Sequence, residues 1–329
     1  MAYGEGTVEP QFINVETNGI TLRVATAGEG PLVLLVHGFP ESWYSWRHQI
    51  RDLAEAGYRV AAPDVRGYGG SSRPKAIEDY AMREMAADMA GLVEAFSSGA
   101  PAVVIGHDWG APIAWHSALL HPDRFRAVAG LSGPHVPLAD RNPLELMKEA
   151  FIDKGRFFYL HYFQTPGRAE AELEADVERA IKTMYYAWSG DAPEGYWHNR
   201  KPVDARLLDE IAPVPESLPA WFSADDAAYY VGEFERTGFR GALNRYRNFE
   251  RDFQIYKSLT SYVIQQPSLF IGGDRDPALV MFPDGPIEQM RTVCAHLRGA
   301  HMLAGIGHWT QQEAPEEVSK ILLEWLAGL

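Results

Sequence analysis

The chain has 329 residues, enough for one large α/β domain or two smaller ones, and its formal net charge of −14 argues against nucleic acid or an anionic membrane surface as a partner. A single cysteine, Cys294, excludes an internal disulfide and fits a reducing compartment. The first residues lack the basic and apolar regions of a signal peptide, and no apolar run approaches the ~18 residues of a transmembrane helix, so we expect a cytoplasmic protein.

Strand and helix patterns alternate along the first part of the chain. Two alternating runs between Phe12 and Ala25 flank Asn18-Gly19, which predicts a two-residue hairpin. The wholly apolar run 32–36 predicts a central strand covered on both faces. Further strands are predicted at 58–63, 101–105 and 125–131, with helices at 43–56 and 82–96. This alternation predicts the α/β fold class, with a mostly parallel, doubly wound sheet.

A helical segment interrupts the alternation from about residue 133 to about residue 260. It contains helical stretches rich in Tyr, Phe and Trp, among them 169–186 and 223–237. The second of these is opened by the capping-box pattern of Ser223 and Asp226. The βα pattern resumes at 267–273, and an amphipathic helix follows Pro315. We therefore expect a core of residues 1–135 and 256–329 and an all-helical cap of residues 136–255, which covers the ligand-binding edge of the sheet.

The sequence Gly106-His107-Asp108-Trp109-Gly110 follows a predicted strand and precedes a helical run. This arrangement is typical of a nucleophile elbow, with Asp in the position that Ser occupies in lipases. Such a turn holds its central residue at positive φ and needs small neighbours. A carboxylate that attacks a saturated carbon leaves an ester, which activated water can hydrolyse. The elbow therefore indicates displacement at a saturated carbon by Asp108, the alternative being an ordinary buried or helix-capping Asp.

An ester intermediate requires a base for water and an acid that orients the base. His308 lies in a Gly-flanked loop before the terminal helix, and the chain order nucleophile, acid, base matches that of hydrolases with this elbow. The turn Gly273-Asp274-Arg275-Asp276 offers two carboxylates. The Gly-x-x-Asp spacing selects Asp276 as the acid, and we expect Asp274 to be a solvated turn residue paired with Arg275.

The same intermediate requires hydrogen-bond donors for its oxyanion. We expect these to be the backbone N–H groups of Phe39, in the turn after the central strand, and of Trp109, beside the nucleophile. His37 is interpreted as a structural histidine that braces its turn. His107 is interpreted as a packed, hydrogen-bonded neighbour of the elbow.

Four core motifs together resemble those of the α/β-hydrolase-fold epoxide hydrolases: His-Gly-Phe-Pro at 37–40, Gly-His-Asp-Trp-Gly-Ala at 106–111, the turn of Asp276, and Gly-His-Trp at 307–309. Two segments of the predicted cap add to the resemblance, Tyr-Phe-Gln-Thr-Pro-Gly at 162–167 and the run 238–248. The resemblance extends from about Phe12 to the C-terminus. Bacterial single-module members are the most similar, because no additional N-terminal domain is seen.

The resemblance implies catalytic roles for five side chains. Asp108, His308 and Asp276 form the triad. In this family, tyrosines at the positions of Tyr162 and Tyr246 reach down from the cap and donate hydrogen bonds to the epoxide oxygen. A phenol suits this role because it donates a hydrogen bond while it stays neutral at pH 7. The implied reaction opens a small apolar epoxide to a vicinal diol through an ester on Asp108, with water as the second substrate and with no cofactor or metal.

The resemblance also implies contacts around the triad. Phe39 and Trp109 are expected to supply the oxyanion hole and, with the two tyrosines, to bind the substrate. The peptide bond between Phe39 and Pro40 is expected to be cis. Two features depart from the family pattern. Arg245 stands where relatives often carry an aromatic residue, and the stretch 187–214 matches no motif.

Two other functions stay open at this point. A haloalkane dehalogenase uses the same Asp-His-Asp triad, and Trp109 could hold its leaving halide, although the paired cap tyrosines would then be unexplained. A non-catalytic ligand-binding protein of the same fold is an alternative of another class, since fold alone does not determine function. The natural epoxide, the stereochemistry and the choice between a monomer and a homodimer are not determined by the sequence.

Overall fold

The computed structural model describes residues 9–329 except 198–199, 212, 280–281 and 283–284. In this part of the chain, eight strands form one sheet in the order β1-β2-β4-β3-β5-β6-β7-β8. Its first two pairs are antiparallel and the remaining pairs are parallel. The strands are β1 (Gln11–Thr17), β2 (Ile20–Ala27), β3 (Leu32–Val36), β4 (Arg59–Pro63), β5 (Ala102–His107), β6 (Phe125–Leu131), β7 (Ile264–Gly273) and β8 (Cys294–Leu303).

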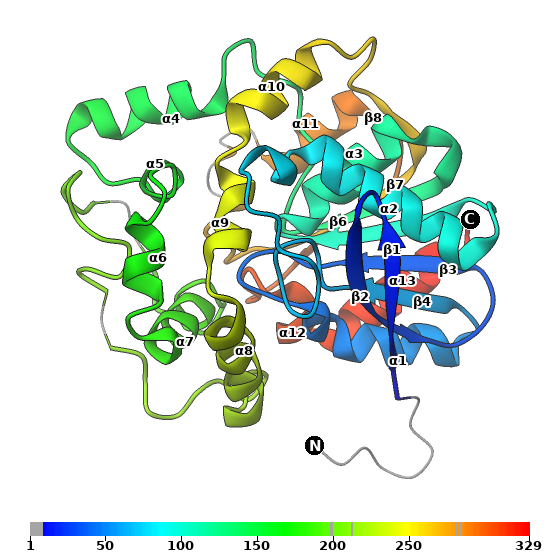
Figure 1. Ribbon diagram of the computed structural model, residues 1–329, viewed down its shortest axis with the longest axis horizontal. Coiled ribbons are helices and arrows are strands. Elements are labelled where there is room, and N and C mark those ends of the chain that lie inside the picture. The colour runs from blue at the N-terminus through cyan, green and yellow to red at the C-terminus, as the bar shows by residue number, and fades with distance from the viewer. Residues whose placement is uncertain (1–8, 198–199, 212, 280–281, 283–284) are drawn as a thin grey trace.

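The predicted hairpin and central strand are confirmed. Asn18 and Gly19 both have positive φ, 47° and 74°, which a two-residue turn between twisted strands requires. All five residues of β3 are buried between neighbours β4 and β5. Figure 1 shows helices α1 and α13 on one side of the sheet and α2 and α3 on the other. The core helices are η1 (Trp43–Trp46), α1 (Arg47–Glu55), η2 (Glu78–Tyr80), α2 (Met82–Ser97), α3 (Gly110–Leu120), η3 (Pro122–Arg124), α11 (Pro286–Val293), α12 (Thr310–Glu313) and α13 (Pro315–Ala327).

Helices fill the chain between β6 and β7 and lie beside the sheet in Figure 1. The predicted helix 223–237 is confirmed, since Ser223 and Asp226 form a capping box. The predicted helix 169–186 is instead two helices, because the Asp176 side chain accepts a hydrogen bond from the Arg179 N–H and starts a new one. The helices are α4 (Pro143–Ala150), η4 (Ile152–Lys154), α5 (Tyr159–Tyr162), α6 (Arg168–Leu173), α7 (Val177–Ala187), α8 (Ala224–Thr237), α9 (Arg240–Tyr246) and α10 (Phe249–Lys257).

This topology decides where chemistry can occur. Strands β3, β5 and β7 run parallel to one another through β6, so their carboxyl ends lie at the same edge of the sheet. The turns after β3, β5, β7 and β8 carry the motifs of residues 37–40, 106–111, 273–276 and 305–309. Parallel sheets bind ligands at this edge. Among the described residues, no helix is both long and apolar enough to cross a membrane.

Candidate active site

Asp108 occupies the tight turn between β5 and α3 with φ of 51°. Left-handed backbone is strained for a residue with a side chain, so the surrounding packing has to hold it. A Cβ atom on Gly106 would clash with the backbone of Gly110, and a Cβ atom on Gly110 would clash with the backbone of Val36. The predicted elbow, and its need for small neighbours, are confirmed.

His308 lies between two carboxylates. Its Nε2 atom is 3.3 Å from Oδ2 of Asp108, and its Nδ1 atom is 3.0 Å from both carboxylate oxygens of Asp276. The carboxylate of Asp276 is buried and also accepts a 2.8 Å hydrogen bond from the Ala278 N–H. The structure thus brings together three residues that lie far apart in the sequence, in the geometry of nucleophile, base and orienting acid.

The other carboxylate of the 273–276 turn has no part in this arrangement. Asp274 is exposed and accepts a 2.8 Å hydrogen bond from the Gly305 N–H. Arg275 donates to the carbonyl of Ala192. The predicted pairing of Asp274 with Arg275 is therefore wrong. Asp274 instead connects the acid turn to the loop that carries His308.

The charges of the three residues depend on one another. Burial lowers the pKa of His308, but the carboxylates of Asp276 and Asp108 outweigh burial and raise this pKa from 6.5 to about 10. Burial raises the pKa of Asp108, yet the hydrogen bond and positive charge of His308 bring it below the usual aspartate value. In the resting protein at neutral pH, His308 is consequently an imidazolium between two carboxylates.

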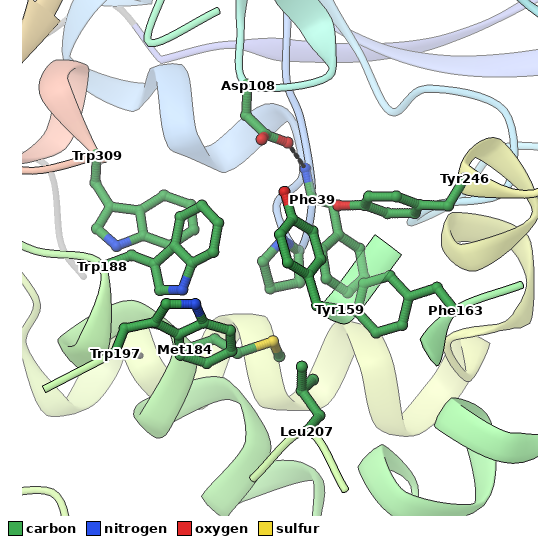
Figure 2. Close-up of a pocket in the computed structure, with 11 residues that line it drawn as sticks. Phe39, Asp108, Tyr159, Phe163, Met184, Trp188, Trp197, Leu207, Tyr246 and Trp309 are labelled. Carbon is green, nitrogen blue, oxygen red and sulfur yellow. Dashed lines mark hydrogen bonds between the residues drawn. The ribbon is translucent and has the colours of Figure 1, made fainter. Parts of the chain in front are cut away.

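A backbone donor already contacts the nucleophile. The Phe39 N–H donates a 2.7 Å hydrogen bond to Oδ1 of Asp108, the dashed line in Figure 2. A Cβ atom on Gly38 would clash with Oδ1 of Asp108, so a glycine is needed where this turn approaches the carboxylate. The expected cis peptide bond between Phe39 and Pro40 is confirmed. Trp109 directly precedes α3 beside Asp108, and the role expected of its N–H group stays a prediction.

Two further histidines support the site, as predicted. His37 accepts a 2.9 Å hydrogen bond from the Val65 N–H at Nε2 and is buried. His107 lies 2.8 Å from a carboxylate oxygen of Glu41 through Nδ1 and 2.7 Å from the carbonyl of His308 through Nε2. His107 therefore bridges Glu41 and the backbone of the base, and holds that backbone in place.

The predicted placement of Tyr162 is wrong. Its hydroxyl donates a 2.6 Å hydrogen bond to the buried carboxylate of Glu172, which also accepts from the backbone N–H groups of Leu207 and Leu208. The guanidinium of Arg168 lies 4.5 Å from the centre of the tyrosine ring. Tyr162 therefore points into the packing of the cap and lines neither of the cavities beside Asp108.

Tyr159 takes the place that was expected of Tyr162. It begins helix α5, three residues before Tyr162. Figure 2 shows the hydroxyls of Tyr159 and Tyr246 directed at the same region, between Phe39 and Asp108. Burial and the charges of Asp108 and Asp276 raise the pKa of Tyr159 well above its usual value. Burial and Asp108 do the same for Tyr246, so both phenols stay neutral and can donate.

Two cavities meet at Asp108. One of about 40 Å³ lies under the cap and is drawn in Figure 2. The other, of about 600 Å³, is lined in addition by Trp109 and His308. Asp108, Tyr159, Trp188 and Tyr246 line both cavities. The unassigned stretch 187–214 supplies three residues to the wall of the smaller one that the sequence patterns did not indicate, namely Trp188, Trp197 and Leu207.

Comparison with known proteins identifies the family. Residues 31–315 match the family described as alpha/beta hydrolase fold. Epoxide hydrolase A of Mycobacterium tuberculosis (strain ATCC 25618 / H37Rv) is 46% identical over 321 residues, 96% of this chain and 97% of that protein. An epoxide hydrolase of Caballeronia sordidicola is 42% identical over 315 residues, 95% of this chain and 92% of that protein. The chain belongs to the α/β-hydrolase-fold epoxide hydrolases.

Solved structures agree with this assignment to the epoxide hydrolases. Epoxide Hydrolase A from Mycobacterium thermoresistibile matches with a TM-score of 0.91 at 45% identity, over 97% of this chain and 99% of that one. The epoxide hydrolase from an endophytic Streptomyces matches with a TM-score of 0.90 at 44% identity, over 97% and 96%. The resemblance stated from the core and cap motifs is confirmed, as is the fold class.

Arg245 occupies a position at which the family pattern led us to expect an aromatic residue. It is buried, forms an ion pair with Asp252, and donates to the carbonyl of Tyr80. Its guanidinium lies 4.8 Å from the centre of the Trp109 ring. Burial lowers its pKa to about 10, so it stays charged at neutral pH. Through its hydrogen bond to Tyr80, Arg245 links the cap to the core beside Tyr246. It also forms part of the wall of the larger cavity.

Proposed function

We propose that this protein hydrolyses epoxides to vicinal diols in two steps, through a covalent ester on Asp108. The observation that carries the proposal is that two neutral phenols, the partly buried Tyr159 and the buried Tyr246, line the cavities that meet at an ionised elbow carboxylate. A nucleophile alone does not open an epoxide readily at neutral pH. The departing oxygen needs a hydrogen-bond donor, and the donors have to be on the other side of the substrate from the nucleophile.

In the first step, Oδ2 of Asp108 attacks one carbon of the epoxide and the bond between that carbon and the ring oxygen breaks. Oδ1 is held by the Phe39 N–H and becomes the ester carbonyl oxygen. The electron pair of the broken bond goes to the ring oxygen, which accepts hydrogen bonds from Tyr159 and Tyr246 and gains a proton to become a hydroxyl. The proton that leaves a phenol is replaced from solvent.

Formation of the ester prepares the second step. It removes the negative charge of Asp108, one of the two carboxylates that raise the pKa of His308. The imidazolium then loses its proton more readily and can act as a base. Neutral His308 takes a proton from water, and the resulting hydroxide adds to the ester carbonyl carbon. The oxyanion forms on Oδ1, where the Phe39 N–H already points and where we expect the Trp109 N–H to contribute.

Collapse of this intermediate breaks the bond between the carbonyl carbon and Oδ2, and the diol leaves with Oδ2, which takes the proton from His308. The carboxylic acid left on Asp108 then gives its proton to His308, which restores the resting pair. Asp276 stabilises the imidazolium that exists between these events. The same triad would serve a haloalkane dehalogenase. Halide leaves without a proton, however, so that reaction does not require the two phenols.

The experiment that tests the proposal traps the ester. In His308→Gln the first step needs no base, so incubation with a small aryl or terminal epoxide should leave one adduct on the peptide that contains Asp108, detected by mass spectrometry. Asp108→Ala is the control and should give no adduct. In a single turnover of the wild type in ¹⁸O-labelled water, the diol should carry an unlabelled oxygen from Asp108. Diol labelled in that first turnover would mean that water attacks the epoxide directly.

A further inference from the structure

The far wall of the 600 Å³ cavity is polar, although most of its lining is apolar. His116, His135, Tyr256 and Tyr262 meet there. The rings of His116 and Tyr256 stack with centres 4.1 Å apart, and those of His135 and Tyr262 lie 4.6 Å apart. His116 lies six residues after Gly110 on helix α3, and at 1.5 Å per residue this is about 9 Å from the nucleophile turn.

The hydrogen bonds of this wall determine which atoms are left for a ligand. Nδ1 of His116 contacts the carbonyl of Pro112, so it carries the hydrogen, and Nε2 then accepts from the hydroxyl of Tyr262 at 3.0 Å. His135 donates from Nε2 to the carbonyl of Tyr262 at 2.9 Å. Its Nδ1 atom is then an acceptor, and no described residue makes a hydrogen bond to this atom or to the Tyr256 hydroxyl, both of which belong to side chains that line the cavity.

The wall carries no charge that would attract an ion. Burial lowers the pKa of His116 to about 3 and that of His135 to about 4, so both rings are neutral at pH 7. Arg245, the nearby cation of the cavity wall, is neutralised by its ion pair with Asp252. A carboxylate placed here would be buried without a counter-charge. A purely apolar group would leave the open polar atoms without partners.

We infer that the larger cavity holds the long arm of the epoxide substrate, and that His135 and Tyr256 bind a neutral hydroxyl group on that arm. The hydroxyl donates a hydrogen bond to Nδ1 of His135 and accepts one from the phenol of Tyr256. The apolar lining between this wall and Asp108 fits the carbon chain that joins the hydroxyl to the epoxide. This inference rests on the proposed epoxide hydrolysis and adds a polar group to the small apolar substrate expected from the sequence.

The test compares terminal epoxides that differ only at the far end of their chain. Each chain length is made with a terminal methyl, hydroxyl or carboxylate group, and kcat/KM is measured for the full-length protein. At the length that reaches the wall, the wild type should prefer the hydroxyl over the methyl compound by about 10- to 100-fold. Shorter chains should show no preference, because their hydroxyl does not reach His135.

Two variants test whether His135 and Tyr256 cause the preference for the hydroxyl compound. His135→Phe keeps an aromatic ring but removes the acceptor, and Tyr256→Phe keeps the ring that stacks on His116 but removes the hydroxyl; each should reduce the hydroxyl-to-methyl ratio toward one. His121→Phe is the matched control, since His121 directly follows the C-terminal end of α3 and does not line the cavity, and it should keep the wild-type ratio. Should His135→Phe fail to fold, Tyr256→Phe and calorimetric binding of the matched diols to the wild type give the same comparison.

Equal turnover of the hydroxyl and methyl compounds at every length would overturn the inference, as would a preference for the carboxylate or an unchanged ratio in both variants. Each of these results leaves epoxide hydrolysis itself intact. If the wild type turns over none of the compounds, the methyl series included, the proposed function fails and the inference falls with it.

Discussion

Nε2 of His308 lies 3.3 Å from Oδ2 of Asp108, so the base and the nucleophile are an ion pair before any substrate binds. The arrangement suits a nucleophile that has to be ionised first and a base that is needed only afterwards. It also means that the base is blocked by its own proton until Asp108 becomes an ester. The pKa of His308 should therefore fall when the ester forms on Asp108.

Replacing Asp108 by Asn mimics the neutral ester and should lower the pKa of His308. In the wild type this pKa is raised to about 10. Removing one of the two negative neighbours destabilises the imidazolium, so its titration midpoint should fall well below that value. NMR titration of the imidazole checks this, with the exposed Asp274→Asn as the control. A midpoint that is the same in Asp108→Asn and the wild type would contradict the proposed timing of the base.

The same histidine makes stability depend on pH. Its pKa in the folded protein is about 10, above the 6.5 of an unperturbed histidine, so the folded state binds this proton more tightly than the unfolded state. The contribution to the free energy of unfolding is complete below about pH 6.5 and is lost as the pH rises to about 10. In Asp276→Asn the free energy of unfolding should fall less over this pH range, because Asp276 is the charge that raises the pKa of His308 most. Urea unfolding at several pH values between 6.5 and 10 measures it, and parallel losses in both proteins would refute the assignment.

Tyr159 and Tyr246 are expected to act in ester formation, whereas Tyr162, three residues after Tyr159, is not. Tyr159→Phe and Tyr246→Phe should each slow formation of the ester, since loss of one oxyanion donor typically costs ~10²–10³ in rate and the second phenol compensates in part. The double variant should be nearly inactive in this step. Hydrolysis of an ester already formed should change little. Pre-steady-state kinetics with an epoxide measures both steps.

Tyr162→Phe is the matched comparison. It removes a buried hydrogen bond to the Glu172 carboxylate, so we expect it to lower the free energy of unfolding by about 1.5–3 kcal/mol and to leave ester formation nearly unchanged. A strong loss of ester formation in Tyr162→Phe, with none in Tyr159→Phe, would reverse the roles of these two tyrosines. The Tyr159→Phe/Tyr246→Phe double variant also tests the dehalogenase alternative, because release of halide from a matched haloalkane should not depend on the phenols.

Gly38→Ala should reduce activity without a large loss of stability. The added Cβ atom would clash with Oδ1 of Asp108 and displace either the carboxylate or the Phe39 N–H that contacts it. A displacement of about 1 Å at reacting atoms can cost about 10²-fold in rate. Gly232→Ala is the control: its Cβ would meet nothing within 4 Å, and the change should slightly stabilise helix α8. Equal activity of Gly38→Ala and Gly232→Ala would remove Phe39 from the oxyanion site.

Much of the catalytic edge could be predicted from the sequence because each part is local. Asp108 is held by a turn whose glycines are its immediate neighbours, and the turn at Phe39 depends on the adjacent Gly38 and Pro40. His308 and Asp276 follow strands whose parallel order places their ends together. In such segments, backbone restrictions and a short apolar pattern are sufficient to locate a side chain.

The cap was decided only by tertiary contacts. The sequence motif led to Tyr162 and not to Tyr159, which lies on the same helical turn, because the outcome depends on the buried carboxylate of Glu172 from another helix. The stretch 187–214 matches no motif, yet it places aromatic side chains in the cavity wall. The partner of Arg245, Asp252, comes from the next helix. The outcomes for Tyr162 and Arg245 depend on which partner a buried polar group meets across the fold, and spacing along the chain does not contain that information.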